Sequence, residues 1–461
     1  PRLRKVAPSL RPSPAAADCP PPRARLMYFN KIPPVANFRH RSPSGAPLLA
    51  RHDGEPGLAP SLHDLGEGVF RLGLGSARWP RHSQAPLDSA VFAPLPSAGS
   101  ATLSADGALR LAWAGHALPK SAPGLAFGVL GQKWAFAFAH HESMRFHGLG
   151  EKNDAFEKTG RITKFWNTDA FADFGVRRAE HAETDPLYAS IPYVLVSRPE
   201  GCVGILIDDP HPVFMNLGAE EHIAHLLPAH EKEPRLLVLG AEDGAPELYF
   251  LLGRDAREVT RKLQRLTGLT PLPPLWALGY HQCRFGYRDL ADLEELDARM
   301  DELGIPCDGL WLDIDYMDAY RVFTVNEGFH DHARRVAALH AKGRRIVPIL
   351  DPGVKNRPGE PVFDGGAARD VFCRTPEGSV YSGFVWPGRT AFPDFSLARA
   401  RAWWADHVRA FTETHGFDGY WIDMNDPSTG SADLDDMLFD EGRAPHASYH
   451  NQYALGMAEA T

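Results

Sequence analysis

Short apolar runs that end on polar or acidic residues recur in the second half of the chain. Residues 309–316 read Gly-Leu-Trp-Leu-Asp-Ile-Asp-Tyr, and residues 345–352 and 419–427 repeat this order of apolar side chains followed by an aspartate. The run 274–282 belongs to the same set but ends on a histidine and a glutamine. Continuous apolar runs of this kind are typical of parallel strands whose two faces are both buried.

Helical patterns fill the intervals between these runs. Residues 289–303, 331–342 and 396–415 each open on an aspartate or a serine cap and are each followed by a glycine. The alternation of strand and helix predicts the first four strands of a (β/α)8 TIM barrel, with a long insert after the third strand.

Three of the predicted strands end on an aspartate: Asp313, Asp351 and Asp423. A buried carboxylate is costly unless it is paired or used. For one strand alone, an aspartate that accepts backbone N–H groups is the better explanation. Because the carboxyl ends of barrel strands converge on one mouth, three such ends together favour a catalytic site.

The first half of the chain has the pattern of a β-domain. From about residue 45 to 254, short alternating runs are separated by Gly, Pro, Ser and Asp, and Arg-Pro-Glu-Gly at 198–201 predicts a hairpin turn. An amphipathic helix is predicted at 255–267, followed by a proline-rich boundary. We therefore expect a disordered or artefactual leader at 1–44, an N-terminal β-sandwich with its linker helix at 45–268 and an incomplete barrel at 269–461.

Composition and charge exclude several classes of binding partner. The chain has 461 residues, a net charge of −9 and a pI near 6.2, which argues against nucleic acid or an anionic membrane as partner. No apolar run is long enough for a membrane span. An odd number of widely spaced cysteines favours a reducing, cytoplasmic compartment over a disulfide framework; they are Cys19, Cys202, Cys283, Cys307 and Cys373.

Several longer motifs occur in a fixed order. Residues 311–318 continue into Tyr-Arg-Val-Phe-Thr at 320–324, and residues 421–425 read Trp-Ile-Asp-Met-Asn. Further motifs lie at 148–152, 275–284, 385–388 and 392–395. Together they resemble glycoside hydrolase family 31, the α-glucosidase family, over roughly residues 140 to 461. The resemblance implies that the β-domain is galactose-mutarotase-like.

The resemblance also implies roles for the acids. Asp423 corresponds to the catalytic nucleophile, an ionised carboxylate that attacks the anomeric carbon. Asp313 corresponds to a residue that binds hydroxyls of the terminal sugar, and Asp351 to another subsite acid. Asp169 lies in a loop that reaches the barrel mouth in this family and would touch the sugar beyond the scissile bond. A structural role explains Asp169 equally well: its side chain can form an Asx turn with the backbone of its own loop.

The walls of the pocket follow from the same comparison. Trp386 resembles the aromatic residue that lines the face of the sugar, and Ile314 and Met424 would supply apolar wall. No cofactor and no metal site is predicted. We interpret Trp403 and Trp404 as core residues of a helix.

The sequence assigns no specific catalytic or binding role to three polar residues near the predicted site. Asp315 and Asp318 are interpreted as structural or supporting residues. For His281, a place in the pocket and a hydrogen-bonded place in the core are equally supported.

The predicted function is that of an exo-acting retaining α-glycosidase, in the first place an α-glucosidase acting on oligosaccharides. The alternatives on the same site are an α-xylosidase, a sulfoquinovosidase, a transglycosylase or an α-glucan lyase; an alternative of another class is a non-catalytic carbohydrate-binding fragment. A homo-oligomer of the full-length enzyme is compatible with the sequence. Two departures from the family pattern, Phe285 for Trp and Asp426 for Glu, bear on the fit of the substrate.

The ends of the chain carry two further expectations. Residues 1–25 are rich in Pro, Ala and Arg, and the first methionine is Met27, so we expect the natural start near that residue. The alternative is a short transit-like leader. Only four barrel strands are predicted, so we expect a fragment of a longer enzyme whose acid/base aspartate lies beyond Thr461. The fragment alone is expected to have little or no turnover.

Overall fold

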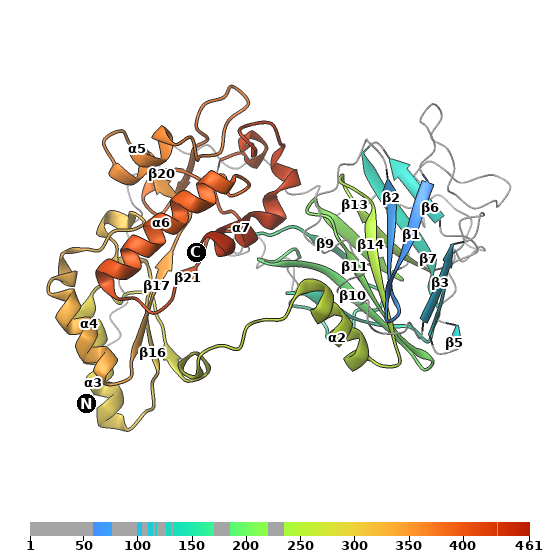
Figure 1. Cartoon of the computed structure of the whole chain (residues 1–461), viewed down its shortest axis with the longest axis horizontal. Helices are drawn as coiled ribbons and strands as arrows, with labels where there is room; N and C mark the ends of the chain where they lie inside the picture. The colour runs from blue at the N-terminus through green and yellow to red at the C-terminus, as the bar shows by residue number, and fades with distance from the viewer. Residues whose placement is uncertain are drawn as a thin grey trace, which may run out of the picture.

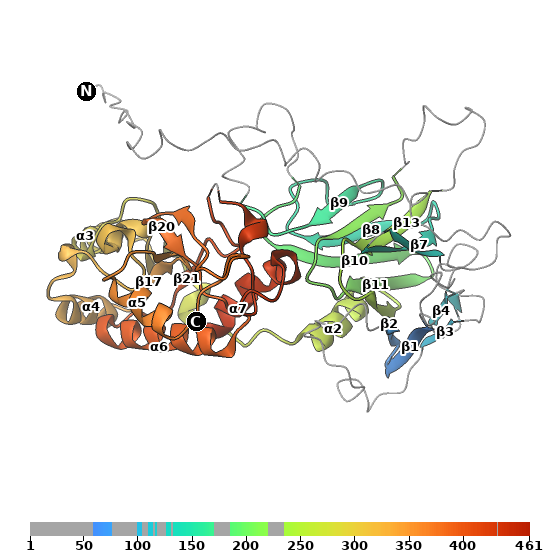
Figure 2. The same cartoon turned by 90° about the horizontal axis from the view of Figure 1, so that it is seen from above.

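The computed structural model describes residues 59–75, 99–103, 109–113, 116–117, 126–130, 132–169, 185–219, 235–430 and 432–461. The leader predicted at 1–44 lies outside these residues. The described elements form a β-rich part and a mixed α/β part that lie side by side (Figures 1 and 2). The predicted division after residue 268 falls between helix α2 (Ala256–Thr267) and the 3-10 turn η5 (Leu275–Leu278).

The β-rich part is a sandwich of two antiparallel sheets. One sheet has the order β1-β2-β14-β11-β10-β8 and the other the order β6-β7-β13-β12-β9. Their inner faces share a core that includes Trp134, Phe146 and Phe250, all essentially without exposure. The strands are β1 (Ala59–Gly66), β2 (Val69–Gly75), β6 (Ala126–Leu130), β7 (Lys133–Ala139), β8 (Arg145–Gly150), β9 (Ile162–Phe165), β10 (Ser190–Arg198), β11 (Gly201–Ile207), β12 (Val213–Leu217), β13 (Leu236–Ala241) and β14 (Glu247–Gly253).

Three smaller features complete this domain. β10 and β11 form the predicted hairpin, with Arg198 paired to Gly201 across the turn. Helix α2 begins after Asp255, whose carboxylate accepts the N–H of Glu258, and ends at Gly268 as the sequence predicts. A separate three-stranded sheet contains β3 (Gly99–Leu103), β4 (Leu109–Trp113) and β5 (His116–Ala117).

The second domain is built on a four-stranded parallel sheet, which confirms the predicted half barrel. Its order is β15 (His281–Gln282), β16 (Gly309–Leu312), β17 (Arg345–Leu350) and β21 (Trp421–Ile422). The register pairs Gly309 with Arg345. Helices α3 (Leu290–Leu303), α4 (His332–Ala341) and α6 (Ala398–His415) connect successive strands.

The predicted helix boundaries hold for α3 and fail in one detail for α6. Asp289 caps α3 by accepting the N–H of Ala291 at 2.8 Å, and Gly304 ends it in the left-handed conformation with φ 65°. Ser396 does not cap α6, because its hydroxyl donates to the buried carboxylate of Asp394 and the helix begins two residues later.

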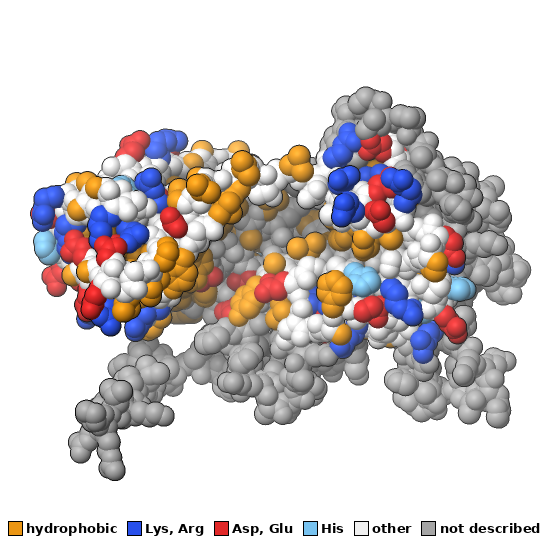
Figure 3. Space-filling model, turned by 90° about the horizontal axis from the view of Figure 1, so that it is seen from below, with side chains coloured by type: hydrophobic (Ala, Val, Ile, Leu, Met, Phe, Trp, Pro, Cys, Tyr) orange, Lys and Arg blue, Asp and Glu red, His pale blue; other side chains and the backbone are white. Residues whose placement is uncertain are grey.

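The first predicted strand is mostly not a strand. Residues 275–278 form a 3-10 turn, in which Ala277 N–H donates to the Pro274 carbonyl at 3.0 Å, and only His281 and Gln282 pair with β16. Proline favours the start of such a turn. Leu275 is 85% exposed, so this segment lacks the burial that its apolar pattern predicted. Figure 3 shows apolar side chains gathered beside the junction of the two domains.

The insert after β17 and the last turns enclose the barrel core. The insert contains α5 (Pro361–Ala368) and a small sheet of β18 (Val354–Lys355), β20 (Gly388–Ala391) and β19 (Gly383–Val385). Trp403 and Trp404 are 2% and 0% exposed, as expected of core residues. The chain closes with η9 (Leu434–Asp436), η10 (His446–Ser448), η11 (His450–Gln452) and α7 (Tyr453–Ala460).

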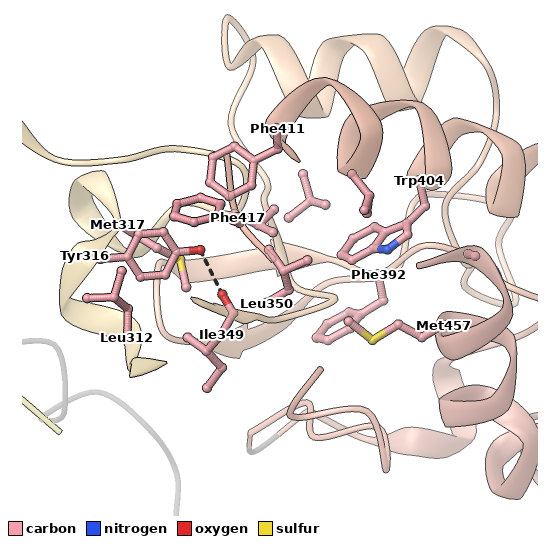
Figure 4. Close-up of a cluster of buried hydrophobic side chains, with 14 of the residues drawn as sticks. Leu312, Tyr316, Met317, Ile349, Leu350, Phe392, Trp404, Phe411, Phe417 and Met457 are labelled. Carbon is pink, nitrogen blue, oxygen red and sulfur yellow. Dashed lines mark hydrogen bonds between the residues drawn. The ribbon is translucent and has the colours of Figure 1, made fainter. Parts of the chain in front are cut away.

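Tyr316 connects two of the strands within this core. Its ring is fully buried, and its hydroxyl donates to the Ile349 carbonyl on β17 at 2.8 Å (Figure 4). Since a buried hydroxyl is costly without a partner, this bond fixes the loop after β16 against β17. The same loop carries Asp313 and Ile314.

Among the described residues, no helix combines the length and hydrophobicity that a membrane crossing needs. The four cysteines in this part of the chain are free thiols, of which only Cys283 is exposed.

Candidate active site

Asp423 follows directly after the short strand β21. Its backbone N–H donates to the Leu350 carbonyl of β17 at 3.0 Å, which holds the residue at the carboxyl end of the sheet. The next residue, Met424, has the left-handed φ of 57°, and its carbonyl accepts the N–H of Ser428 at 3.1 Å. A non-glycine residue in this conformation stores strain, and such residues cluster at functional sites.

The carboxylate of Asp423 is half-buried among other acids. Burial raises its pKa above the ordinary value, and the charges of Asp313 and Asp169 raise it further. A hydrogen bond from the Met424 N–H opposes this effect. The electrostatic influence of Asp313 and Asp169 is evidence that the fold brings these three acids close to one another.

Asp313 occupies the corresponding place after β16. Its Oδ1 accepts the N–H of Ile314 at 2.7 Å, so the capping arrangement considered from the sequence does occur at this strand end. Burial raises the pKa of Asp313, with a smaller contribution from Asp315. Asp313 is half-buried, so capping and substrate contact are compatible.

Asp351, after β17, has a different environment, because it is only 2% exposed. One carboxyl oxygen accepts the N–H of Gly353, and the other has no hydrogen-bond partner among the described residues. Burial, followed by the charges of Asp423 and Asp426, raises the pKa of Asp351 well above its ordinary value. Burial and the neighbouring acids therefore favour the protonated form of this group, which lies near the candidate nucleophile.

Asp169 reaches this group of acids from the β-sandwich. Its backbone N–H donates to Asp426 Oδ2 at 3.0 Å, and its Oδ2 accepts the Ser428 hydroxyl at 3.2 Å. Ser428 also lies 2.7 Å from Asp426 Oδ1. The loop therefore lies against the segment that follows Asp423 and is held by it.

The residues expected to form the pocket wall are all half-buried. Ile314 and Trp386 pack against the edge of the barrel core. Trp386 follows β19, and the N–H of Phe384 in that strand donates to the Thr429 carbonyl at 3.1 Å. The insert therefore lies against the loop after Asp423. Met424, the third expected wall residue, adjoins the carboxylate in sequence.

A second set of contacts joins the two domains beside Asp169. The indole of Trp166 stacks on the imidazole of His450, with ring centroids 3.6 Å apart. Asn167 donates its N–H to Asn451 Oδ1 at 2.8 Å, and its carbonyl accepts from His450 Nε2 at 2.7 Å. The loop 166–169 is thereby attached to the barrel domain at both ends.

His446 extends this contact inward. His446 Nε2 lies 2.7 Å from His450 Nδ1, and both rings are buried. Because a carbonyl can only accept, His450 carries its proton on Nε2. His446 lies between two acceptors, His450 Nδ1 and the Met437 carbonyl 3.1 Å from its Nδ1, and its neutral ring can donate to only one of them. Burial lowers the pKa of His446 to about 4, which keeps the pair uncharged at neutral pH.

Other polar residues near the strand ends have structural contacts. His281 Nε2 donates to the Trp276 carbonyl at 2.9 Å, and Nδ1 accepts from Trp311 at 3.0 Å. Both ring nitrogens are occupied, which favours the core reading of this histidine. The exposed carboxylate of Asp318 pairs with Arg321, and Asp315 accepts from Tyr320 at 3.3 Å.

Sequence reasoning did not single out the residues that attach the loop. For His446 and His450, the spacing of four residues is a signal, since it places two side chains on one helical face. For Asn451 and Ser428 the sequence carries no comparable signal, because their partners lie more than 250 positions away.

Within the described part of the chain, no group of three or more His, Cys, Asp or Glu side chains is arranged to hold a metal ion. The chemistry available at the strand ends is that of carboxyl groups with raised pKa values beside an aromatic and apolar wall.

A sandwich domain is followed by parallel barrel strands that carry acids at their carboxyl ends, and comparison with known families identifies this arrangement. The model of the glycosyl hydrolases family 31 TIM-barrel domain matches residues 270–461. The model of the glycosyl hydrolase 31 N-terminal galactose mutarotase-like domain matches residues 113–216. The chain belongs to glycoside hydrolase family 31.

Individual relatives agree with this assignment. The chain is 37% identical over 347 residues to alpha-glucosidase 2 of Bacillus thermoamyloliquefaciens, covering 73% of this chain and 41% of that protein. It is 34% identical over 297 residues to lysosomal alpha-glucosidase of Rattus norvegicus, covering 62% of this chain and 28% of that protein. The chain thus spans well under half the length of these relatives.

The fold is also that of a solved structure. The glycoside hydrolase family 31 dextranase of Flavobacterium johnsoniae, complexed with glucose, superposes with a TM-score of 0.74 at 21% sequence identity. The superposition covers 87% of this chain and 49% of the dextranase chain. At this identity the similarity supports the sandwich and half-barrel fold alone.

Proposed function

We propose that this chain is part of an exo-acting retaining α-glycosidase, in the first place an α-glucosidase, with Asp423 as the nucleophile. The observation that carries the proposal is the position of Asp423. It follows a barrel strand, its neighbour Met424 is held in a strained conformation, and two further half-buried acids lie close enough to affect its pKa. The family membership supports the reaction class.

In the proposed reaction, the ionised carboxylate of Asp423 attacks the anomeric carbon of a terminal α-linked sugar. The bond to the leaving oxygen breaks as a second carboxyl group protonates that oxygen, and a glycosyl ester forms on Asp423. Water then attacks the same carbon, with the second group acting as base, and the ester is released. We assign this second role to none of the acids described above.

The surrounding residues have supporting roles in this scheme. Asp313 would accept hydrogen bonds from hydroxyls of the terminal sugar, and such bonds strengthen as the ring flattens toward the oxocarbenium-like transition state. Asp351 would keep the base of the site polar as a further subsite acid. Trp386, Ile314 and Met424 would form the wall, and Asp169 would contact the sugar beyond the scissile bond.

A small oligosaccharide is therefore the proposed substrate. The four free thiols in the described part of the chain are compatible with the cytoplasmic location proposed from the sequence.

The test is covalent labelling of the full-length protein with a mechanism-based 5-fluoro-α-glucosyl fluoride, followed by peptide mass spectrometry. The proposal requires the label on Asp423, and no label in the Asp423→Asn variant. Asp436→Asn is the matched control, since Asp436 is exposed and lies outside the group of acids. A label on another carboxylate would refute the assignment.

A further inference from the structure

Two residues just after the candidate nucleophile, Asp426 and Ser428, contact the loop of the sandwich that carries Asp169. Asp169 and Asp426 are 257 positions apart in sequence, yet the Asp169 backbone N–H donates to Asp426 Oδ2 at 3.0 Å. This bond runs from a main-chain donor to a charged acceptor. Bonds of this kind are stronger than neutral ones and are sensitive to the position of the acceptor.

Ser428 adds a second point of attachment. Its hydroxyl lies 2.7 Å from Asp426 Oδ1 and 3.2 Å from Asp169 Oδ2. The Asp169 main chain is thus bound by Asp426, while its carboxylate lies beside the Ser428 hydroxyl, whose one hydrogen is shared between the two carboxylates and lies nearer to Asp426. The two contacts reach different atoms of Asp169, its backbone nitrogen and its carboxylate.

Asp426 is not positioned as a reacting group. Each of its carboxyl oxygens already has a partner, one in Asp169 and one in Ser428. Its segment is itself anchored, because Ser428 N–H donates to the Met424 carbonyl at 3.1 Å. Asp426 therefore links the strained turn after Asp423 to the sandwich loop without facing the substrate.

We propose that Asp426 is a positioning residue that, together with Ser428, holds the Asp169 carboxylate at the mouth of the site and so sets the contact with the leaving-group sugar. The inference rests on the proposed function for the sugar contact, but the attachment itself does not. It also gives a role to the departure from the family pattern at this position, where glutamate is usual.

The length of the side chain matters in this arrangement. A glutamate at position 426 has one more methylene group, which moves the acceptor by about 1.5 Å. Since hydrogen-bond lengths vary by only a few tenths of an ångström, the Asp169 loop has to shift or lose the bond. Asp426→Glu therefore changes the position of the Asp169 carboxylate while keeping the charge.

The direct test measures hydrogen exchange at the Asp169 amide by mass spectrometry, in the 461-residue chain at one pH. Asp426→Ala is expected to speed exchange at this amide about tenfold or more, because the acceptor is gone. Ser428→Ala is expected to have a smaller effect, since the bond from the amide remains. Asp436→Ala, an exposed aspartate on a neighbouring turn, is the matched control and is expected to leave the rate unchanged.

Unchanged exchange at Asp169 in a folded Asp426→Ala variant would overturn the proposal. If that variant does not fold, Asp426→Glu is measured instead, with faster exchange expected and an unchanged rate again contradicting the role.

A second measurement on the full-length enzyme examines the sugar contact. With Asp426→Glu, we expect KM for maltose to rise several-fold while kcat/KM for nitrophenyl α-glucoside stays within about twofold, because the aryl leaving group does not use Asp169. An equal loss on both substrates would contradict a leaving-group role. Faster amide exchange without any glycosidase activity would sustain the attachment and refute the proposed function.

Discussion

Trp166 of the sandwich and His450 of the barrel domain lie face to face, with ring centroids 3.6 Å apart and planes within 1°. His450 also donates to the carbonyl of Asn167, and its Nδ1 lies 2.7 Å from His446 Nε2. The stack therefore forms one end of a buried set of contacts that joins the two domains through both histidines.

Acid should weaken this junction. The folded pKa of His446 is lowered to about 4, below the ordinary 6.5, so the unfolded chain binds protons first as the pH falls. Stability from this group is complete above pH 6.5 and is lost between about 6.5 and 4, by on the order of 2 kcal/mol at pH 5. Thermal unfolding at pH 7.5 and 5.0 measures the effect. His446→Gln should reduce the pH dependence, and an unaltered dependence in that variant would exclude His446 as its source.

Removing the carboxylate of Asp423 should abolish turnover in the full-length enzyme. Asp423→Asn retains the shape of the side chain, but a carboxamide cannot form the glycosyl ester. We expect kcat to fall by several orders of magnitude while the variant remains folded. Steady-state kinetics with nitrophenyl α-glucoside provide the measurement, and recovery of activity with added azide would support the loss of a nucleophile.

Asp313→Ala should have a smaller effect on the same enzyme. The change removes hydroxyl contacts and leaves the catalytic groups in place, so the loss in kcat/KM should correspond to a few kcal/mol at most. Asp318→Ala is the comparison, since Asp318 is exposed and pairs with Arg321 outside the group of acids. Equal kcat/KM for the Asp313 variant and the wild type would rule out the proposed sugar contact.

Asp351→Asn should stabilise the chain at neutral and higher pH. Burial holds the folded pKa of Asp351 well above 3.8, so the folded state keeps a proton that the unfolded state releases. Its stabilising contribution is complete below pH 3.8 and is lost as the pH rises toward the folded pKa, at up to about 1.4 kcal/mol per pH unit. Asparagine does not titrate, so the advantage of the variant should grow with pH. Urea unfolding at pH 5, 6 and 7 tests this, and a constant difference would contradict it.

The stereochemistry of the reaction provides an independent prediction. Double displacement through Asp423 requires a second carboxyl group about 5 to 5.5 Å away, closer than the roughly 6.5 to 9.5 Å of inverting enzymes. Proton NMR of the first sugar released from an α-glucoside by the full-length enzyme should show α-glucose. If β-glucose is formed first, direct attack by Asp423 is wrong.

The sequence predicted the parallel strands and the acids at their ends well, because apolar runs and terminal aspartates are local patterns. It also located both ends of α2 and α3, where Asp255 and Asp289 cap the first turn and a glycine follows the last. Local patterns predicted the wrong structure at two places, where tertiary contacts compete with the local preference. Ser396 donates to Asp394 in place of capping α6, and the apolar run at 274–282 forms a turn.

The attachment of Asp169 could not be predicted in the same way. A loop motif indicated that this residue approaches the barrel, but its partners Asp426 and Ser428 come from the other domain. Hydrogen bonds between residues so far apart in sequence leave no periodic signal. The buried environment of Asp351 was likewise invisible, since its acidic neighbours are assembled only by folding.

The segment between α2 and β15 is the covalent connection of the two domains, and it is well exposed at Leu269, Leu272 and Leu275. The contacts of Asn167 with Asn451 and of Asp169 with Asp426 lie far from it along the chain. A protease that cuts once in this connection should therefore leave two pieces that still migrate as one particle under native conditions. The two domains would then separate only when denaturant or acid disrupts the stack of Trp166 on His450.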